Sequence, residues 1–421
     1  MMFSVEKLPC GAGLAVAEMP QVESVSVGLW FGVGGRHEPE RLSGVSHFIE
    51  HMIFKGTRRR SAREISEAVE GVGGYLNAFT AEEMTCYFAK ASARHFPRLC
   101  DVLLDMLVHS TFPPEEIERE RGVICEEIRM YEDQPQQVAQ EKLNALLWAG
   151  HPLGRPLAGT VKHVERMSRA DLMDYRQKHY HAGNLWISIA GKVSPAQAKA
   201  VLEPLLKRLQ AGRPAKASPV LVKQRAPRVE VVRKPIEQSH IAIGLRSVSR
   251  HDPQRFAVRL MSVILGENMS SRLFQEIREK HGLAYSIQST VSYLHDTGCF
   301  GISAGVENGK LSKALTLALK SVKQFAAKGP TAEELTRAKE YTLGQMALSL
   351  ESTTNQMMWM GEHAISHGKV IDPSKVTEKI ESVTASQIKA IAQTLVQDSR
   401  LNVAVVSPVA EAESIRALSH F

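Results

Sequence analysis

Two histidines and a glutamate near residue 50 are spaced in a way that suits metal chemistry. His47, Glu50 and His51 form the pattern His-x-x-Glu-His within residues 43–54, a stretch whose composition suits a helix. On a helix, positions four apart share one face, so both imidazoles can reach one ion while Glu50 projects beside them. Imidazoles are ligands of Zn²⁺, and a neighbouring carboxylate can take a proton from a zinc-activated water. The pattern therefore predicts a hydrolytic zinc site.

Two imidazoles make an incomplete site, because a hydrolytic zinc usually has three protein ligands and one open position. A further carboxylate is therefore needed downstream. The acidic segment 115–132 contains Glu120 and Glu127, which are seven residues apart and hence on one face of a helix. Spacing alone leaves two interpretations open: a third ligand from this helix, or a solvated acidic face.

Two stretches that contain these residues resemble a known family. HFIEHMIFKGT and ERERGVICEEIRMYED resemble the motif helix and the third-ligand helix of the M16 peptidases, which include pitrilysin, insulinase and mitochondrial processing peptidase. The family's third ligand is a Glu some 76 residues after the motif, and this count from His51 ends at Glu127. GGYLNAFTAEEMTCYF, HPLGRPLAGT and HGLAYS also resemble family segments, so the resemblance covers nearly the whole chain.

The resemblance implies a role for each residue of the site. It makes His47, His51 and Glu127 the ligands of one Zn²⁺ per chain, and Glu50 the general base. Glu120 becomes a carboxylate behind the ligands that orients and tunes the site, and the adjacent Glu126 becomes a solvated residue. The implied activity is that of a zinc metalloendopeptidase with the inverted HxxEH motif, which cuts peptides or unstructured protein segments.

Other segments are predicted to hold the substrate. Residues 75–80 and 85–89 suggest a hairpin, and by resemblance to the family its edge, at Asn77, Ala78 and Phe79, pairs with an extended peptide. A purely structural hairpin is the alternative. The segment RLFQEIREKHGLAYS resembles the part of the family that supplies Arg278 and Tyr285 to the active site. A guanidinium and a phenol can both donate to a substrate carbonyl or to the oxyanion formed from it.

The elements that position these residues are predicted to form two domains. A chain of 421 residues suits two cores, and residues 211–228, rich in Pro, Ala and basic residues, are predicted to be a linker. The predicted domains are 1–210, with the zinc site, and 229–421, which contributes substrate-binding residues. Short matches at an offset of 216 residues indicate an internal duplication. Strand-like runs alternate with helical ones in each half, so we expect an α+β fold with helices on one face of a mainly antiparallel sheet.

The duplication also predicts which half binds metal. In the alignment of the two halves, Glu127 falls on Gln345 and Glu120 on Ala338. The segment opposite HxxEH, residues 261–267, contains no histidine. Only the first half can then bind zinc, and we expect the second to close a chamber or bind substrate.

Composition excludes several other classes of protein. The five cysteines have no CxxC spacing, which argues against a disulfide framework and a thiolate zinc site. The N-terminus lacks the pattern of a signal peptide, and no apolar run is long enough to span a membrane, so we expect a cytoplasmic protein. The net charge of +7 is dispersed, which argues against nucleic-acid binding.

We expect a homodimer, because larger relatives enclose substrate between two such halves. A non-catalytic assembly subunit is the alternative function, since some relatives have lost the metal site. The intact motif and Glu127 argue against it.

Overall fold

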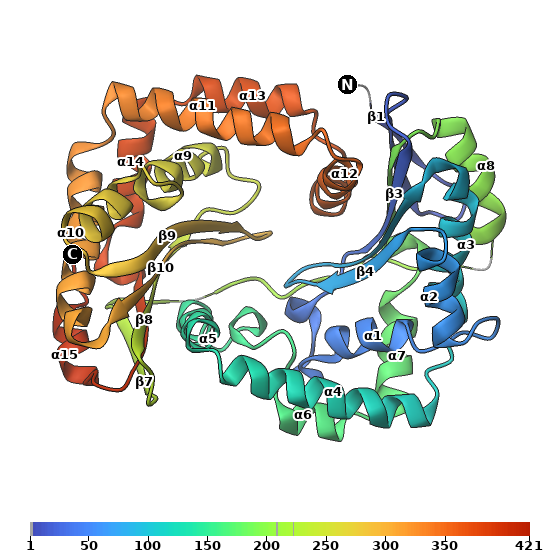
Figure 1. The fold of residues 1–421 in the computed structure, drawn as a ribbon, viewed down its shortest axis with the longest axis horizontal. Helices are drawn as coiled ribbons and strands as arrows, with labels where there is room; N and C mark the ends of the chain where they lie inside the picture. Colours follow the sequence, from blue (N-terminus) through green and yellow to red (C-terminus); the bar gives the residue numbers. More distant parts are fainter. Residues whose placement is uncertain (1–2, 208, 222) are drawn as a thin grey trace. The chain divides into compact units, whose positions relative to one another are not determined.

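The computed structural model describes residues 3–207, 209–221 and 223–421, and the chain divides into two compact units (Figure 1). Unit 1 comprises Met1–Ile128, Pro156–Ser218 and Met346–Pro373; unit 2 comprises Arg129–Arg155, Pro219–Gln345 and Ser374–Phe421. Each unit contains one mainly antiparallel sheet with packed helices. The predicted α+β class with two sandwich domains is therefore confirmed.

Unit 1 is built on a six-stranded sheet with the order β1-β2-β6-β3-β5-β4. Its strands are β1 (Phe3–Lys7), β2 (Gly13–Glu18), β3 (Ser24–Phe31), β4 (Tyr75–Thr80), β5 (Thr85–Ser92) and β6 (Leu185–Gly191). Its helices are α1 (Val45–Ile53), α2 (Ala62–Glu70), α3 (Phe96–His109), most of α4 (Pro114–Glu132), α6 (Val161–Arg166), α7 (Arg169–His179), α8 (Pro195–Leu206) and α12 (Thr353–His367). Every strand pairing is antiparallel except that of β2 with β6.

Unit 2 is built on a five-stranded sheet with the order β7-β11-β8-β10-β9. Its strands are β7 (Arg228–Arg233), β8 (Gln238–Ser247), β9 (Ala284–Tyr293), β10 (Gly298–Glu307) and β11 (Leu401–Ser407). Its helices are α5 (Pro135–Leu147), α9 (Arg255–Gly266), α10 (Leu311–Lys328), most of α11 (Ala332–Ser349), α13 (Pro373–Ser382), α14 (Ala385–Leu395) and α15 (Ala412–Leu418). Among the described strands of unit 2, only β7 and β11 pair in parallel.

The two sheets share one topology. Without β1, the order in unit 1 is β2-β6-β3-β5-β4, which corresponds strand for strand to the order in unit 2. The single parallel pairing of each sheet, β2 with β6 and β7 with β11, falls at the same place. The shared topology agrees with an internal duplication. None of the described helices is long and apolar enough to cross a membrane.

Each sheet buries both of its faces. Along β3, Val27, Leu29 and Phe31 point into the larger core, which also contains side chains of α1 and α3. Trp30 points to the opposite face, where it lies in a smaller cluster with Met357 and Met360 of α12. Side chains alternate across a strand, so a fully buried strand has two faces that need cover.

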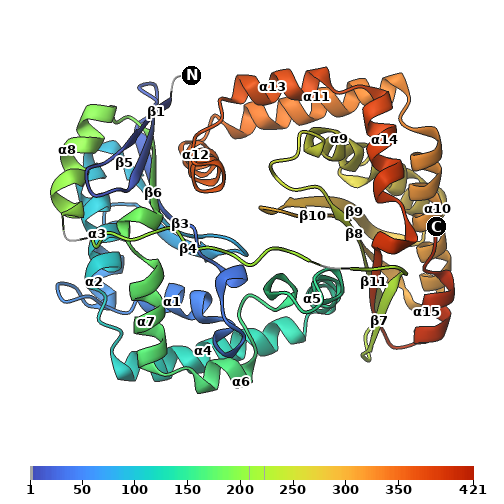
Figure 2. The same cartoon turned by 180° about the vertical axis from the view of Figure 1, so that it is seen from behind.

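The helix that covers the second face of each sheet comes from the other half of the sequence. α12 packs on β2, β3 and β6, and α5 packs on β8 and β11 (Figures 1 and 2). The compact units therefore differ from the predicted contiguous domains 1–210 and 229–421, because residues 129–155 and 346–373 are exchanged. Helical periodicity marks a buried face but does not say which sheet buries it. Between Leu206 and Arg228, the described residues form no helix or strand.

α12 lies unusually close to its sheet. A Cβ added to Gly361 would lie 2.0 Å from the indole of Trp30, and one added to Gly28 would lie 2.3 Å from Sδ of Met357. Glycine at both positions permits this approach. At the start of the helix, the hydroxyl of Ser26 donates to that of Thr353 at 3.0 Å. Residues from both ends of the sequence thus form one closely packed layer.

Candidate metal centre

The start of the motif helix α1 is fixed by a buried carboxylate. Glu38 accepts hydrogen bonds from the backbone N–H groups of Gly44 at 2.7 Å and Ser46 at 2.8 Å. Carboxylates are favourable at this end of a helix because its first N–H groups have no partners within the helix. Gly44 has a φ of +92°, and a Cβ there would lie 2.4 Å from the carbonyl oxygen of Ala158. The helix therefore begins at a defined place.

The apolar side of α1 determines where the polar residues point. Val45, Phe48, Ile49 and Met52 are buried in the main core of unit 1. These four residues are spaced so that they share one face of the helix, and the motif residues therefore lie together on the other side. The polar side thus carries His47, Glu50 and His51, each partly buried.

The three predicted ligands converge. Nε2 of His47 and Nε2 of His51 each lie 3.6 Å from Oε2 of Glu127 on α4. Ligand atoms at zinc distances of about 2.0–2.2 Å in a tetrahedron are roughly 3.4 Å apart. The observed separations fit two ligands around such an ion and exceed an ordinary hydrogen bond. Among the described residues, His47, His51 and Glu127 are the three His, Cys, Asp or Glu side chains whose ligand atoms lie close enough together to bind one metal ion.

The two imidazoles are in different electrostatic states. Burial lowers the pKa of His47 to about 4, with a further contribution from nearby His51, so this ring is neutral and available as a ligand. Burial also acts to lower the pKa of His51, but hydrogen bonds and charges from Glu120 and Glu127 outweigh it and raise the pKa to about 9. Metal binding would release the proton from His51, because an imidazole that coordinates a metal must be neutral at the coordinating nitrogen.

Glu120 lies behind the candidate ligands. Its Oε2 is 2.9 Å from Nδ1 of His51, and its Oε1 is 2.6 Å from Nζ of Lys55. Burial would raise the pKa of Glu120, but these two hydrogen bonds lower it on balance. A carboxylate at Nδ1 orients a metal-binding imidazole and fixes which nitrogen faces the ion. Glu126, predicted to be solvated, is exposed.

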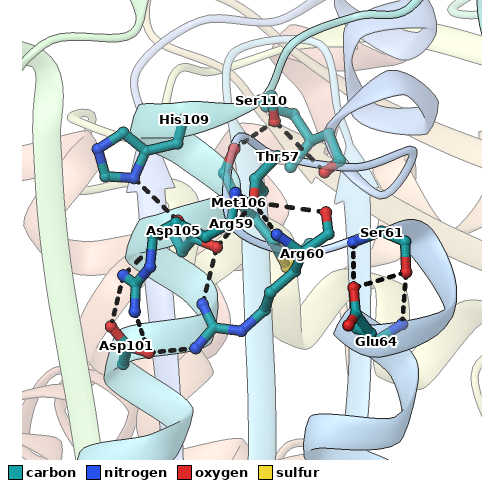
Figure 3. Close-up of polar contacts among 11 residues, drawn as sticks. Thr57, Arg59, Arg60, Ser61, Glu64, Asp101, Asp105, Met106, His109 and Ser110 are labelled. Atoms are coloured by element: carbon teal, nitrogen blue, oxygen red, sulfur yellow. Dashed lines mark hydrogen bonds and ion pairs between the residues drawn. The ribbon is translucent and has the colours of Figure 1, made fainter.

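The turn after α1, which carries Lys55, is held against α3 by ion pairs (Figure 3). Arg60 binds Asp101 and, at 2.7 Å, the fully buried carboxylate of Asp105. Arg59 contacts Asp101 at 3.0 Å, and the hydroxyl of Thr57 donates to Asp105 at 2.9 Å. Arg59 and Arg60, which belong to the basic run Arg58–Arg60, therefore anchor the turn beside the candidate metal centre.

Glu50 meets the edge strand of the sheet. Oγ1 of Thr80, the last residue of β4, donates to Oε2 of Glu50 at 2.5 Å. Burial raises the pKa of Glu50, and the hydrogen bond from Thr80 offsets part of this effect. A carboxylate with a raised pKa that remains hydrogen-bonded suits a general base that works near neutral pH.

The predicted substrate-binding residues of unit 1 lie on the same strand. Asn77, Ala78 and Phe79 occupy β4, whose only strand partner among the described residues is β5. The amide nitrogen of Asn77 lies 2.6 Å from the hydroxyl of Tyr75, and Phe79 packs edge-on against Trp30 at 5.7 Å. The outer edge of β4 is thus available to another extended chain.

Unit 2 holds the other two predicted residues side by side. Arg278 lies in a π-helical segment, Phe274–Lys280, and Tyr285 lies in β9. The guanidinium carbon of Arg278 is 5.4 Å from the ring centre of Tyr285, and Tyr285 is 77% exposed. The two donors therefore form one cation–π pair near the protein surface.

The positions in unit 2 that align with the candidate metal centre carry apolar side chains. Val263 on α9 and Ala338 on α11, aligned with His47 and Glu120, line a pocket of about 530 Å³ whose lining also includes polar residues such as Asn268, Glu334 and Arg337.

Sequence reasoning did not assign roles to Glu38, Lys55 or Thr80. Lys55 follows His51 by four residues, and Thr80 ends the predicted edge strand, but lysines after helices and threonines in strands are common. Their contacts become visible only when the elements are assembled.

Comparison with known proteins identifies the family. Residues 14–161 match the family described as insulinase (peptidase family M16), and residues 166–341 match the peptidase M16 inactive domain. The chain is 34% identical to an uncharacterized zinc protease of Streptomyces coelicolor over 97% of this chain and 90% of that protein. It is also 34% identical to the uncharacterized zinc protease YmxG of Bacillus subtilis, over 94% and 96% of the two chains.

Solved structures share the fold at lower identity. A peptidase M16 inactive domain from Pseudomonas fluorescens superposes with a TM-score of 0.91 at 20% identity, covering 97% of this chain and 99% of that one. A protease from Helicobacter pylori gives a TM-score of 0.90 at 20% identity with the same coverage. Two matched domains and relatives that extend over nearly its whole length show that this chain belongs to the M16 peptidase family.

Proposed function

We propose that the protein is a zinc-dependent endopeptidase that hydrolyses peptides or unstructured protein segments, with one zinc bound by His47, His51 and Glu127. The observation that carries the proposal is the convergence of both Nε2 atoms on Oε2 of Glu127. Glu50 lies beside them on the same helix. Relatives that are named zinc proteases support the same activity.

The chemistry is divided between the metal and the residues around it. Zinc at these ligands would act as a Lewis acid, which would lower the pKa of a bound water molecule and polarise a peptide carbonyl. Glu50 accepts a proton from the water as the water oxygen attacks the carbonyl carbon, and returns it to the amine nitrogen as the C–N bond breaks. Glu120 holds Nδ1 of His51, so that Nε2 faces the ligand cluster.

The substrate would be held as an extended chain. The outer edge of β4, at Asn77, Ala78 and Phe79, can pair with a peptide backbone as an added strand. Arg278 and Tyr285 supply hydrogen bonds to a substrate carbonyl or to the oxyanion that develops from it. Backbone pairing recognises a strand rather than a particular sequence, which agrees with unstructured substrates.

A homodimer completes the proposed enzyme. Two copies of a two-domain chain would form the closed chamber that larger members of the family build from one chain. In this arrangement, Arg278 and Tyr285 of one protomer serve the zinc site of its partner.

Metal analysis combined with peptide cleavage tests the proposal. The purified protein should contain one zinc per chain and cut internal bonds of a diverse peptide library. A chelator should abolish cleavage, and added zinc should restore it. Cleavage that persists after complete zinc removal would rule out the proposed activity.

A further inference from the structure

Thr80 connects the edge strand to the general base. Its hydroxyl donates to Oε2 of Glu50 at 2.5 Å, and its backbone also hydrogen-bonds the carboxyl group. This O–H···O distance lies at the short end of the range for hydrogen bonds to an ionised acceptor. Among the described residues, Thr80 is the one whose hydroxyl contacts Glu50.

The strand presents Thr80 in a fixed orientation. Ala78 and Leu76, two and four residues earlier, pack on the main core, so Thr80 shares the face of β4 that points toward α1. Its backbone is set by the pairing of Thr80 with Thr85 and by the turn in which Ala81 N–H donates to the carbonyl of Met84 at 2.8 Å. The hydroxyl therefore has little freedom relative to the sheet.

A glutamate needs such a constraint to act as a base. Its side chain has three rotatable bonds, whereas a general base must lie within about 2.6–3.2 Å of the proton that it removes. Displacement of a reacting group by about 1 Å can reduce a rate roughly 10²-fold. A donor that occupies one carboxylate oxygen restricts the side chain and leaves the other oxygen for the reaction.

We propose that Thr80 is a positioning residue that holds Oε2 of Glu50, so that Oε1 is the oxygen that accepts the proton from water. The proton taken up at Oε1 leaves on the amine nitrogen of the product, and Thr80 keeps its own proton throughout. Because Thr80 ends the strand to which substrate would add, it also fixes the base relative to the bound peptide. This inference rests on the proposed peptidase function.

Three variants of the full-length, zinc-loaded protein test the role of the hydroxyl. Thr80→Val removes it with little change in shape, Thr80→Ser retains it, and Thr85→Val is the matched control. Thr85 faces Thr80 across the hairpin, and its hydroxyl donates to the carbonyl of Val33 at 2.9 Å rather than to Glu50.

Thr80→Val should lower kcat for an unstructured peptide about 10- to 100-fold, with KM and zinc content unchanged. Thr80→Ser should recover most of the rate. Thr85→Val should keep its kcat even if its thermal stability falls. A second readout does not depend on turnover: crystals of metal-free Thr80→Val should show the Glu50 carboxylate displaced or in several rotamers.

The inference fails if Thr80→Val keeps the wild-type kcat, or if Thr80→Ser is as slow as Thr80→Val. If the wild-type protein cuts no peptide, the proposed function fails instead. The position of Glu50 in the Thr80→Val crystals then decides whether Thr80 holds the carboxylate, and an unmoved side chain would reject that role.

Discussion

Glu120 accepts a hydrogen bond from Nδ1 of His51 at 2.9 Å and so holds the ring whose other nitrogen faces Glu127. Both glutamates lie on α4, one as an orienting group and one as a proposed ligand. This relationship predicts that substitutions along one helix face will affect zinc binding to different degrees.

Three single substitutions on α4 should separate these roles. Glu127→Gln should reduce zinc occupancy most, because a ligand is lost. Glu120→Gln should weaken zinc binding roughly 10- to 100-fold, as expected for a residue behind a ligand. Glu126→Gln, at an exposed position, should bind like the wild type. Competition with a calibrated chelator measures all three, and a large effect at Glu126 would mean that the ligand assignment is shifted by one residue.

Removal of the base should separate binding from chemistry. Glu50→Gln leaves the ligands in place, so zinc content should stay at one per chain. Peptide hydrolysis should fall about 10²-fold or more, because the amide cannot take up the proton. Metal analysis and initial rates on the same sample provide the measurement. Wild-type activity in this variant would overturn the mechanism.

The ion pairs of the turn after α1 should contribute to stability. Asp105→Asn weakens the interaction of a fully buried carboxylate with Arg60, Thr57 and His109. The free energy of unfolding should fall by about 1–3 kcal/mol, the range for a buried group that loses charged hydrogen-bond partners. Urea denaturation measures this change. Glu67→Gln is the control, because it removes an exposed ion pair with Arg63. It should change the free energy of unfolding by less than about 0.5 kcal/mol.

Two glycine-to-alanine substitutions in helices should have opposite effects. Gly361→Ala places a Cβ 2.0 Å from the indole of Trp30, so α12 must move away from its sheet. Overpacking of this kind lowers stability by about 1–3 kcal/mol. Gly344→Ala on α11 meets nothing within 4 Å and should raise stability by up to about 1 kcal/mol, because alanine favours helices. Equal thermal midpoints for the two variants would contradict the close packing of α12.

Mixed dimers test whether the site is completed by a partner. Glu50→Gln and Arg278→Ala protomers should each be nearly inactive alone. If Arg278 and Tyr285 act on the partner's zinc site, every mixed dimer contains one intact site and activity returns. Mass spectrometry should verify that mixed dimers form. Hydrolysis that stays at the level of the separate mutants, with mixed dimers present, would reject the shared site.

The proposed zinc ligands could be predicted from the sequence for two reasons. His47 and His51 share one turn of a helix, which is a local spacing, and the family pattern leads from them to the distant Glu127. The contact of Thr80 with Glu50 was not accessible, because it joins a strand and a helix that are 30 residues apart. The sheet on which α12 packs could not be predicted either. The spacing of Met357 and Met360 indicates a buried helix face, but it does not identify the sheet that covers this face.

The exchange of α5 and α12 has a consequence for how the chain came to exist. In a single ancestral repeat with this connectivity, one face of the sheet would have been exposed to solvent, because the helix of that repeat does not pack on its own sheet. Two copies that exchanged these helices would each have buried the exposed face, as in a domain-swapped dimer. Gene fusion would then have joined the two copies in one chain. A cut in the linker should accordingly yield two pieces that are insoluble apart and recover solubility when refolded together.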